Sequence, residues 1–354
     1  MEKTVSYQDQ VNREDVQKLR EVLKTLPPFA KDYFRAIEPT TSTRTRISYA
    51  YDIRIFFQFI LSENPSFKNK TVADLKVDVL DKMQAVDIEE YQEYLKLYNN
   101  DDKTLTNGER GLKRKMSALR SFYAYYYKRE MIKTNPTLLV DMPKLHDKAI
   151  VRLDADETAE LLDYIEHCGD QLTGQKKVYY EKTKLRDLAI VTLLLGTGIR
   201  VSECVGLDVN DVDFKNGGIR VVRKGGSEMM VYFGEEVEKA LLDYLEVRSS
   251  ITPVAGHENA LFYSSQRKRI GVKAVENMVK KYAREITTTK KITPHKLRST
   301  FGTSLYKETG DIYLVADVLG HKDVNTTRKH YAAMDEDRRR RAASAVKLRE
   351  HTDT

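Results

Sequence analysis

The sequence predicts a mainly α-helical protein with two domains and one small three-stranded antiparallel sheet. Three observations support this fold class. Amphipathic runs with apolar residues at helical spacing recur along the chain, and a stretch with little periodicity separates two groups of them. Only residues 212–233 combine short β-prone runs with tight-turn dipeptides. The 354 residues are enough for two domains that each bury a core of their own.

The chain begins with an amphipathic helix. Residues 12–26 place apolar side chains on one helical face, and Pro27 and Pro28 stop the run because proline disrupts a helix beyond its first turn. We therefore assign residues 1–29 to an N-terminal helical extension.

A larger helical domain is expected over residues 30–140. N-cap oxygens at residues 41–43 precede an apolar helical face, and further helices are expected over residues 87–97 and 107–128. This part of the sequence contains no convincing strand pattern. The interpretation is an α-helical domain.

A proline-containing segment separates this domain from the next. Residues 141–152 have little periodicity and are interpreted as an extended linker. A new helix begins where Asp154 or Asp156 can serve as its N-cap. The second domain is expected over residues 153–334, followed by a helical tail over residues 335–354.

The strand signal lies within the second domain. Residues 212–233 contain two dipeptides typical of tight turns, Asn216-Gly217 and Gly225-Gly226, between short β-prone runs. They predict a three-stranded antiparallel meander.

Composition favours a basic protein without a membrane span. The net charge of +7 and a pI near 9.0 suit a polyanionic partner, although solvated charged faces explain them equally well. No stretch reaches the roughly 18 apolar residues of a membrane span, and the N-terminus lacks the apolar region of a secretory signal. Cys168 and Cys204 have no metal-type spacing and are interpreted as reduced thiols in a cytoplasmic protein.

Two basic residues stand at expected chain reversals. Arg200 follows an apolar helix that ends at Gly196 or Gly198, where glycine lets the chain turn sharply. Lys224 lies in the turn of the expected hairpin. Taken singly, each residue is also an ordinary surface cation.

Residues 292–334 gather histidine, arginine and tyrosine. Pro294 suits the first turn of a helix capped by Thr293. His295 and Arg298 then share one face beside a helix N-terminus, which attracts anions such as phosphate.

A further helix is expected to end at Gly320, followed by His321 and later by Tyr331. A zinc site made of His295, His321 and His330 has suitable ligand types, but the spacing matches no common site. We therefore expect no metal and no other cofactor.

The order of these residues resembles the catalytic set of the tyrosine recombinases, the family of phage-type integrases and Xer recombinases. The segments "GTGIRVSE", "RKGG", "HKLRSTFGT" and "VLGHKDVNTT" carry the resemblance, which spans residues 153–340 and extends more loosely over the helical domain. The longer N-terminus is similar to Xer-like enzymes of Gram-positive bacteria. The spacing from His321 to Tyr331 is one residue longer than in many members. The matching residues are Arg200, Lys224, His295, Arg298, His321 and Tyr331.

The resemblance implies a site-specific DNA recombinase with the two-domain architecture of that family. Tyr331 would attack a DNA phosphodiester and form a 3′-phosphotyrosyl intermediate on the way to a Holliday junction, without metal or ATP. Arg200 and Arg298 would bind the phosphate through planar forks that lysine lacks. Lys224 would protonate the leaving 5′-oxygen.

The remaining site residues have supporting roles in this scheme. His295 would assist proton transfer at the tyrosine, and His321 would donate a hydrogen bond to a phosphate oxygen. Glu203 would hold the side chain of Arg200, although a simple helix N-terminal charge is an equal alternative.

Two domains joined by a linker suit a clamp around double-stranded DNA. Candidate phosphate contacts in the first domain are Arg44, Arg46, Arg110, Lys113 and Arg114, with a solvated helical face as the alternative for each. By analogy with the family, the tail packs on a neighbouring subunit of a homotetramer, or else docks on its own subunit. The resemblance leaves room for a second recombinase or a DNA translocase as a further partner.

Two other functions are compatible with the same residues. A type IB topoisomerase nicks and reseals DNA as a monomer by the same chemistry, but the helical domain and the tail argue against it. A non-catalytic DNA-binding regulator on this fold is disfavoured because every catalytic position is filled. Chromosome-dimer resolution, integration and inversion of a DNA segment are all open as the biological role.

Overall fold

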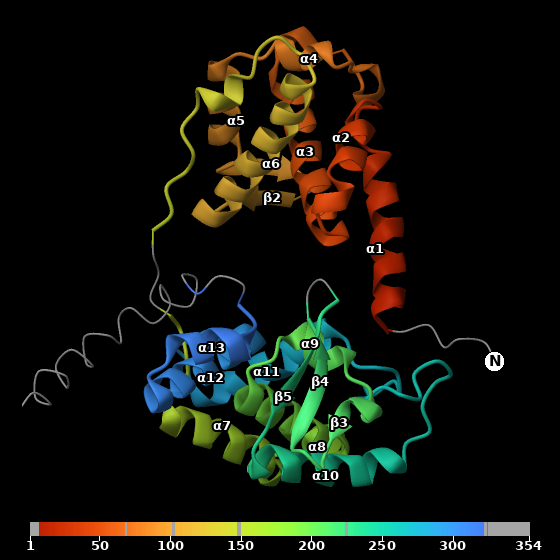
Figure 1. The fold of residues 1–354 in the computed structure, drawn as a ribbon, viewed down its shortest axis with the longest axis vertical. Coiled ribbons are helices and arrows are strands. Elements are labelled where there is room, and N and C mark those ends of the chain that lie inside the picture. The colour runs from red at the N-terminus through yellow and green to blue at the C-terminus, as the bar shows by residue number, and fades with distance from the viewer. Residues whose placement is uncertain are drawn as a thin grey trace, which may run out of the picture. The chain divides into compact units, whose positions relative to one another are not determined.

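The structure is a computed structural model that describes residues 7–67, 69–100, 103–146, 150–223, 226–321 and 324. The chain divides into two compact units, Met1–Lys148 and Ala149–Thr354 (Figure 1). Both units are mainly helical, as the sequence predicts. Among the described helices, none combines the length and the apolar character needed to cross a lipid bilayer.

The first unit is a bundle of helices. In chain order these are α1 (Tyr7–Leu23), α2 (Ala30–Ala36), α3 (Thr43–Glu63), α4 (Asp78–Asp81), α5 (Ala85–Tyr94) and α6 (Glu109–Lys128). Helix α3 lies at the centre, with α1 and α6 packed against it (Figure 1). Helix α1 places Leu19 and Val22 in the core of this unit.

The apolar face predicted for α3 forms the middle of this core. The Ser42 side chain accepts a hydrogen bond from the backbone N of Thr45 and caps the helix. The side chains of Ile53 and Phe56 are fully buried, and the Phe56 ring packs edge-to-face on Tyr91 of α5 at 5.1 Å between centroids. Burying a ring of this size contributes about 2–3 kcal/mol before the entropic cost of ordering it.

A short hairpin in the first unit corrects the expectation that this region contains no strand. Strands β1 (Leu97–Asn100) and β2 (Lys103–Thr106) pair antiparallel, with Tyr98 opposite Leu105. Each strand has only four residues, so an alternating pattern does not stand out against the flanking helices. Tyr98 is buried and anchors the hairpin to the core.

The expected linker has no regular secondary structure where it is described, over residues 141–146 and 150–152. The second unit then begins with α7 (Ala155–His167). Of the two caps that the sequence allows for α7, the structure uses Asp154, whose carboxylate accepts a hydrogen bond from the backbone N of Glu157 at 2.9 Å.

The second unit surrounds one long buried helix. After α7, its elements are α8 (Gly174–Thr197), α9 (Val201–Gly206), β3 (Val212–Asp213), β4 (Gly218–Val222), β5 (Glu228–Tyr232), α10 (Glu235–Ser249), α11 (Val272–Ile286), α12 (Pro294–Thr309) and α13 (Ile312–Leu319). Helices α7, α10 and α12 all pack on α8, which carries the apolar run of the sequence (Figure 1).

The predicted three-stranded meander is confirmed. The strands lie in the order β3-β4-β5, all antiparallel, with Ile219 opposite Val231 in the β4–β5 pair. Gly217 has a φ of +60° in the first turn, a backbone conformation that glycine adopts without strain. Along β4, Ile219 and Val221 face inward and Arg220 faces solvent, so side chains alternate between the two faces.

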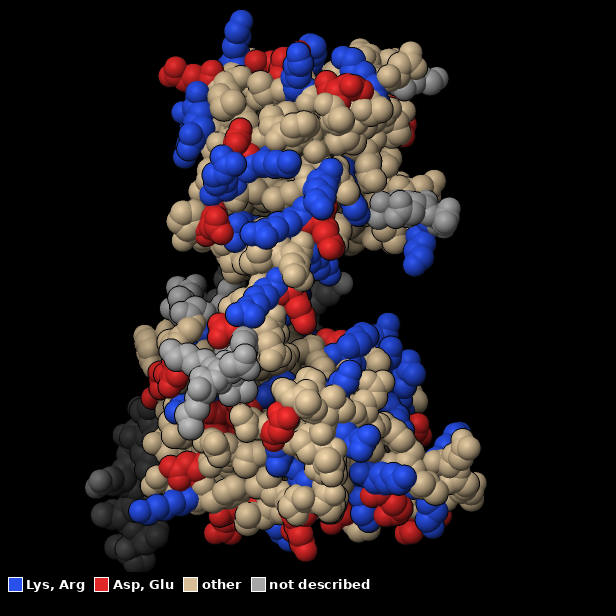
Figure 2. All heavy atoms as spheres, turned by 90° about the vertical axis from the view of Figure 1, so that its right-hand side faces the viewer, with Lys and Arg blue, Asp and Glu red and all other residues tan. Residues whose placement is uncertain are grey.

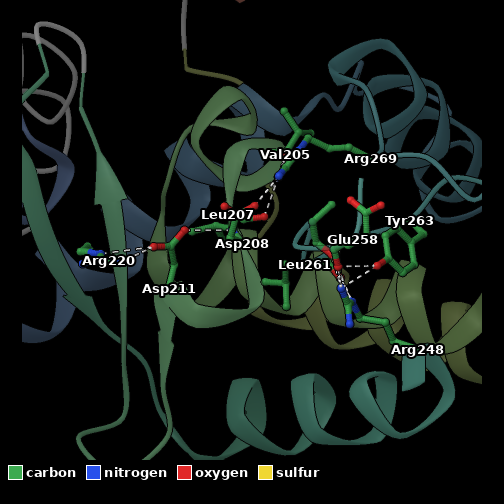
Figure 3. A network of polar contacts seen from close by, with 11 residues as sticks. Val205, Leu207, Asp208, Asp211, Arg220, Arg248, Glu258, Leu261, Tyr263 and Arg269 are labelled. Atoms are coloured by element: carbon green, nitrogen blue, oxygen red, sulfur yellow. Dashed lines mark hydrogen bonds and ion pairs between the residues drawn. The ribbon is translucent and has the colours of Figure 1, made fainter. Parts of the chain in front are cut away.

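Two arginines hold the loop between α10 and α11, Arg269 to the end of α9 and Arg248 to α10 (Figure 3). Arg269 donates to the backbone oxygens of Val205 and Leu207 and forms an ion pair with Asp208. Arg248 donates to the backbone oxygen of Leu261 at 3.1 Å.

Candidate active site

A glycine ends helix α8 and starts the chain reversal before Arg200. Gly198 has a φ of +61°, and a Cβ at this position would lie 2.3 Å from a ring carbon of Phe301. Both the backbone conformation and the close approach require glycine. The prediction that glycine ends this helix is confirmed, at the second of the two glycines proposed.

Arg200 is held on one side and open on the other. It occupies the N-cap of α9, and its Nη1 donates to Oε1 of Glu203 at 2.7 Å. The other carboxylate oxygen of Glu203 accepts from the backbone N of Arg200 at 2.8 Å. The side chain of Glu203 is 4% exposed and that of Arg200 37% exposed. The buried acid therefore orients a guanidinium that still reaches solvent.

Arg298 lies deep in the unit, on the first turns of α12. Its Nη1 donates to the backbone oxygen of Gly198 at 2.5 Å, and its Nη2 donates to the backbone oxygen of Leu319. The arginine thus joins the reversal after α8 to the end of α13. His295, three residues earlier, is exposed, while Arg298 is buried.

The start of α12 differs from the prediction in one detail. Pro294 occupies the first helical turn as expected, and Thr293 is the N-cap residue. The Thr293 side chain, however, makes no capping hydrogen bond. The backbone oxygen of Thr293 instead accepts from the backbone N of Lys296 at 2.7 Å and so closes the first turn.

Helix α13 ends at a glycine in the left-handed conformation, as predicted, and His321 is the next residue. Gly320 has a φ of +60°, and the backbone N of His321 donates to the oxygen of Ala316 at 2.8 Å. This arrangement satisfies carbonyls that the helix end would otherwise leave unbonded. His321 is half-buried immediately after this cap.

Three arginines from separate elements meet at the last carbonyls of α13. Arg200 Nη2 lies 3.4 Å from the backbone oxygen of Gly320, and Arg298 donates to that of Leu319. The third is Arg223, which follows β4 and was not among the predicted site residues. The C-terminus of a helix carries a partial negative charge, so it attracts cations. The resulting cluster of guanidiniums can bind a phosphate oxygen.

The structure brings together only part of the predicted set. Arg200, Glu203, Arg298 and the backbone before His321 converge, and His295 lies one turn from Arg298 on α12. Lys224, Tyr331 and the tail over residues 335–354 lie outside the described residues.

Within the part of the chain that the structure describes, no cluster of histidine, cysteine or acidic residues has the arrangement of a metal site. Cys168 and Cys204 are buried and form no disulfide. Burial raises the pKa of the Cys204 thiol to about 12, which keeps this thiol protonated near neutral pH.

The candidate phosphate contacts of the first unit differ in how far they are available. Figure 2 shows lysine and arginine side chains over one face of this unit, with acidic side chains between them. Arg44 is exposed and forms an ion pair with Asp15 at 2.8 Å. Arg46 is buried and forms an ion pair with Glu38 at 3.0 Å, so the structure favours it least among the candidates.

The other candidates lie on α6. Arg110 and Arg114 are exposed and Lys113 is half-buried. Arg114 forms an ion pair with Asp52, a fully buried carboxylate of α3. Exposure lets Arg110 and Arg114 reach a phosphate, and Arg114 is also held by the buried Asp52.

The chain belongs to the phage integrase family, whose sequence pattern matches residues 151–338. It is similar to tyrosine recombinase XerC of Caldanaerobacter subterraneus subsp. tengcongensis, with 33% identity over 90% of this chain and 86% of the relative. It is also similar to tyrosine recombinase XerS of Streptococcus uberis, with 31% identity over 88% of this chain and 93% of the relative. The chain is thus a Xer-like site-specific DNA recombinase.

Solved structures show the same fold. The XerH site-specific recombinase in a post-cleavage complex with a palindromic difH substrate matches with a TM-score of 0.66 and 20% identity, over 97% of this chain and 90% of XerH. A lambda integrase dimer bound to a COC′ core site matches with a TM-score of 0.58 and 16% identity, over 84% of this chain and 95% of that integrase chain. The predicted fold class is confirmed.

Proposed function

We propose that this recombinase cleaves double-stranded DNA with Tyr331 as nucleophile and rejoins it through a Holliday junction. The phenol oxygen forms a bond to phosphorus as the bond to the 5′-oxygen breaks. The products are a 3′-phosphotyrosyl link and a free 5′-hydroxyl. This hydroxyl later attacks the 3′-phosphotyrosyl link of a partner strand and releases the tyrosine of that link. The energy of the broken bond is retained in the phosphotyrosyl link, so strand exchange needs no ATP.

One observation supports this proposal most strongly: Arg200, Arg298 and the backbone that precedes His321 meet at the end of α13. Arg200 and Arg298 would grip the non-bridging oxygens of the phosphate. Fixed donors act mainly on the crowded, highly charged transition state, where one lost donor costs about 3 kcal/mol. Glu203 would keep the Arg200 fork pointing toward the phosphate.

Proton transfers would fall to the other residues of the set. A free tyrosine has a pKa near 10, so Tyr331 has to lose its proton during attack, and the exposed imidazole of His295 would assist. His321 would donate a hydrogen bond to a phosphate oxygen. Lys224 would protonate the 5′-oxygen, which is a poor leaving group without a proton.

DNA is the proposed partner of both units. The XerH and lambda integrase structures to which the fold is similar hold DNA, which supports this partner. Arg44, Arg110 and Arg114 would contact the phosphate backbone from the first unit, and such contacts position the duplex without reading its sequence. A homotetramer with an exchanged tail would pair the strands for exchange.

The proposal is tested by covalent trapping of DNA. The wild-type protein is incubated with DNA fragments of the host genome, and protein–DNA adducts are isolated after denaturation and sequenced. Tyr331→Phe should abolish the adducts while leaving DNA binding unchanged within about twofold, because only one oxygen is removed.

Tyr313→Phe is the matched control, since Tyr313 on α13 is 71% exposed and has no proposed role. Its adduct yield should equal that of the wild type. Adducts that persist in Tyr331→Phe would overturn the assignment of the nucleophile. Relaxation of any supercoiled plasmid without site preference would favour a topoisomerase instead.

A further inference from the structure

Arg223 is a buried cation that the proposed reaction does not use. It directly follows β4 and is 8% exposed. Its backbone N donates to the oxygen of Ser227 at 2.8 Å, and its own oxygen accepts from the backbone N of Gly226 at 3.0 Å. The residue therefore sits at the start of the turn that joins β4 to β5, with its side chain directed into the unit.

The guanidinium of Arg223 spans the end of α13. Nη1 donates to the backbone oxygen of Leu319 at 2.7 Å, and Nη2 donates to that of Val318 at 2.8 Å. The Leu319 oxygen also accepts from Arg298, so the two arginines share one acceptor. A lysine has a single nitrogen and cannot bind two successive carbonyls with this planar geometry.

The last residue of this helix end is shaped around the same guanidinium. A Cβ at Gly320 would lie 2.4 Å from Nη1 of Arg223, closer than any side chain carbon can approach. Gly320 also has a φ of +60°. The glycine that ends α13 is thus required both for the backbone reversal and for the passage of the arginine.

Burying a guanidinium costs free energy unless its partners offset the loss of hydration. Burial lowers the pKa of Arg223, and the neighbouring Arg200 adds to this shift, while Glu203 opposes it. An apolar residue of similar length would fill the space at lower cost. Residue 223 is instead an arginine whose guanidinium fixes the oxygens of Val318 and Leu319 next to the arginines of the site. This arrangement indicates a function beyond packing.

We propose that Arg223 is a positioning residue for strand cleavage, because it ties the start of the β4–β5 turn to the last turn of α13. It fixes the Leu319 oxygen and thereby the direction of the Arg298 fork and the exit of the chain toward His321. This role rests on the proposed function of Arg298 and His321. It requires no contact between Arg223 and DNA.

The first test uses the DNA-free protein and so does not depend on the proposed reaction. Hydrogen exchange is measured for peptides that cover residues 312–321 in the wild type, in Arg223→Met and in Arg223→Lys. Both variants should exchange these amides at least about tenfold faster than the wild type, because the end of α13 loses its fastening.

Arg220→Met is the matched control, since Arg220 lies three residues earlier on β4, is exposed and pairs with Asp211 at 3.0 Å. It should leave exchange over residues 312–321 unchanged. Equal protection in wild type and Arg223→Met would overturn the fastening of α13. Melting temperatures identify any variant that fails to fold. If Arg223→Met does not fold, the comparison is made between the wild type and Arg223→Lys.

The second test uses the full chain and the DNA sequence recovered in the trapping experiment. It measures the single-turnover rate at which the protein cleaves this DNA. Arg223→Met should cleave about a hundredfold more slowly with DNA affinity within about threefold, because misplaced catalytic groups slow the chemical step. Arg223→Lys should be nearly as slow, and Arg220→Met should match the wild type within about threefold. Full activity of Arg223→Lys would show that charge alone matters and would overturn the proposal.

A sulfur-substituted substrate separates this role from that of the adjacent Lys224. When sulfur replaces the leaving 5′-oxygen, protonation is unnecessary, so Lys224→Ala should regain cleavage. Arg223→Met should stay slow on the same DNA, because its defect lies at Arg298 and His321. Rescue of Arg223→Met would instead place its effect on the leaving group and overturn the proposal. If wild-type protein forms no adduct, the proposed function fails, while the exchange experiment still decides on α13.

Gly320→Ala gives an independent approach to the same contact. The added methyl group should displace the Arg223 guanidinium and reproduce the slow cleavage of Arg223→Met. Gly256→Ala is its control, because Gly256 has a φ of +84° but no atom lies near the added carbon. Combining Gly320→Ala with Arg223→Met should be no slower than either change alone, since both remove one interaction. If the double variant slowed cleavage by the product of the two single effects, the two residues would not act through one shared contact.

Discussion

Three arginines of the first unit, Arg44, Arg46 and Arg114, differ from Arg223 and Arg298 near the end of α13 in the groups that they bind. In the first unit, Arg44 and Arg114 each bind a carboxylate, and Arg46 does so in a buried position. At the end of α13, Arg223 and Arg298 donate to backbone carbonyls. A carbonyl satisfies an N–H donor but brings only a partial charge. Carbonyl partners therefore offset less of the Arg223 charge than a carboxylate would, while the neighbouring Arg200 pairs with Glu203.

Among the described residues of the site, Arg298→Lys should have the largest effect on cleavage, because it keeps the charge and loses the fork. Cleavage should slow about a hundred- to a thousandfold, equivalent to about 3–4 kcal/mol of transition-state stabilisation. DNA affinity should change less than about fivefold. Single-turnover adduct formation and gel-shift titration measure the two quantities. A rate within tenfold of wild type would mean that charge, and not donor geometry, dominates this site.

The carboxylate pairs of the first unit should matter for stability instead. Asp52→Ala leaves Lys115 buried, with a side chain 7% exposed and no carboxylate beside it. Burial raises the pKa of Asp52 despite its two cationic neighbours, so the buried carboxylate itself adds little to stability. The loss of stability in Asp52→Ala therefore comes from Lys115, which stays buried without its partner. The free energy of unfolding should fall by about 3–5 kcal/mol in urea titration.

Asp15→Ala provides the matched comparison for Asp52→Ala. Asp15 pairs with the exposed Arg44 at 2.8 Å, and exposed pairs contribute at most about 1 kcal/mol. Its loss should therefore change the unfolding free energy far less. Equal losses in the two variants would contradict the distinction between buried and exposed pairs.

Glu203→Gln should have an intermediate effect on cleavage. The amide keeps the shape of the carboxylate and can still accept from Arg200, but it loses the charge that strengthens this bond. We expect cleavage to slow about tenfold, since hydrogen bonds to charged groups contribute about 1.5–3 kcal/mol. The rate is measured on trapped DNA, with circular dichroism as the check on folding. An unchanged rate would assign Glu203 to helix capping alone.

The smallest effect is expected for Arg44→Ala. DNA affinity should fall about threefold, and the slope of log affinity against log salt should decrease by about 1 in magnitude, as for one lost phosphate contact. Arg46→Ala is the comparison, because its guanidinium is buried against Glu38. It should lower stability and leave the salt slope unchanged. A changed slope in Arg46→Ala would restore that residue as a phosphate contact.

Much of the site's framework follows from the sequence through its glycines. Gly198 and Gly320 end apolar helices, so Arg200 and His321 are predicted to project from chain reversals. The caps at Ser42 and Asp154 also follow from residue type. These features depend on interactions between near neighbours in the chain, which a single sequence reveals.

Features that depend on contacts between distant segments were missed. Arg223 binds carbonyls of α13, far along the chain, although the alternation after Ile219 and Val221 already places it on the inner face. Arg46 was assigned to a surface although it lies four residues before the fully buried Ala50. In both cases the periodicity carried a signal, but charged side chains are usually expected at the surface.

The most direct test of the site is a crystal structure of Tyr331→Phe bound to the DNA that the wild type cleaves. The account predicts one phosphate at the cleavage position within hydrogen-bond distance of Arg200, Arg298 and His321, with Arg223 still bound to the carbonyls of α13. A cleavage-site phosphate that contacts none of these three residues would contradict it.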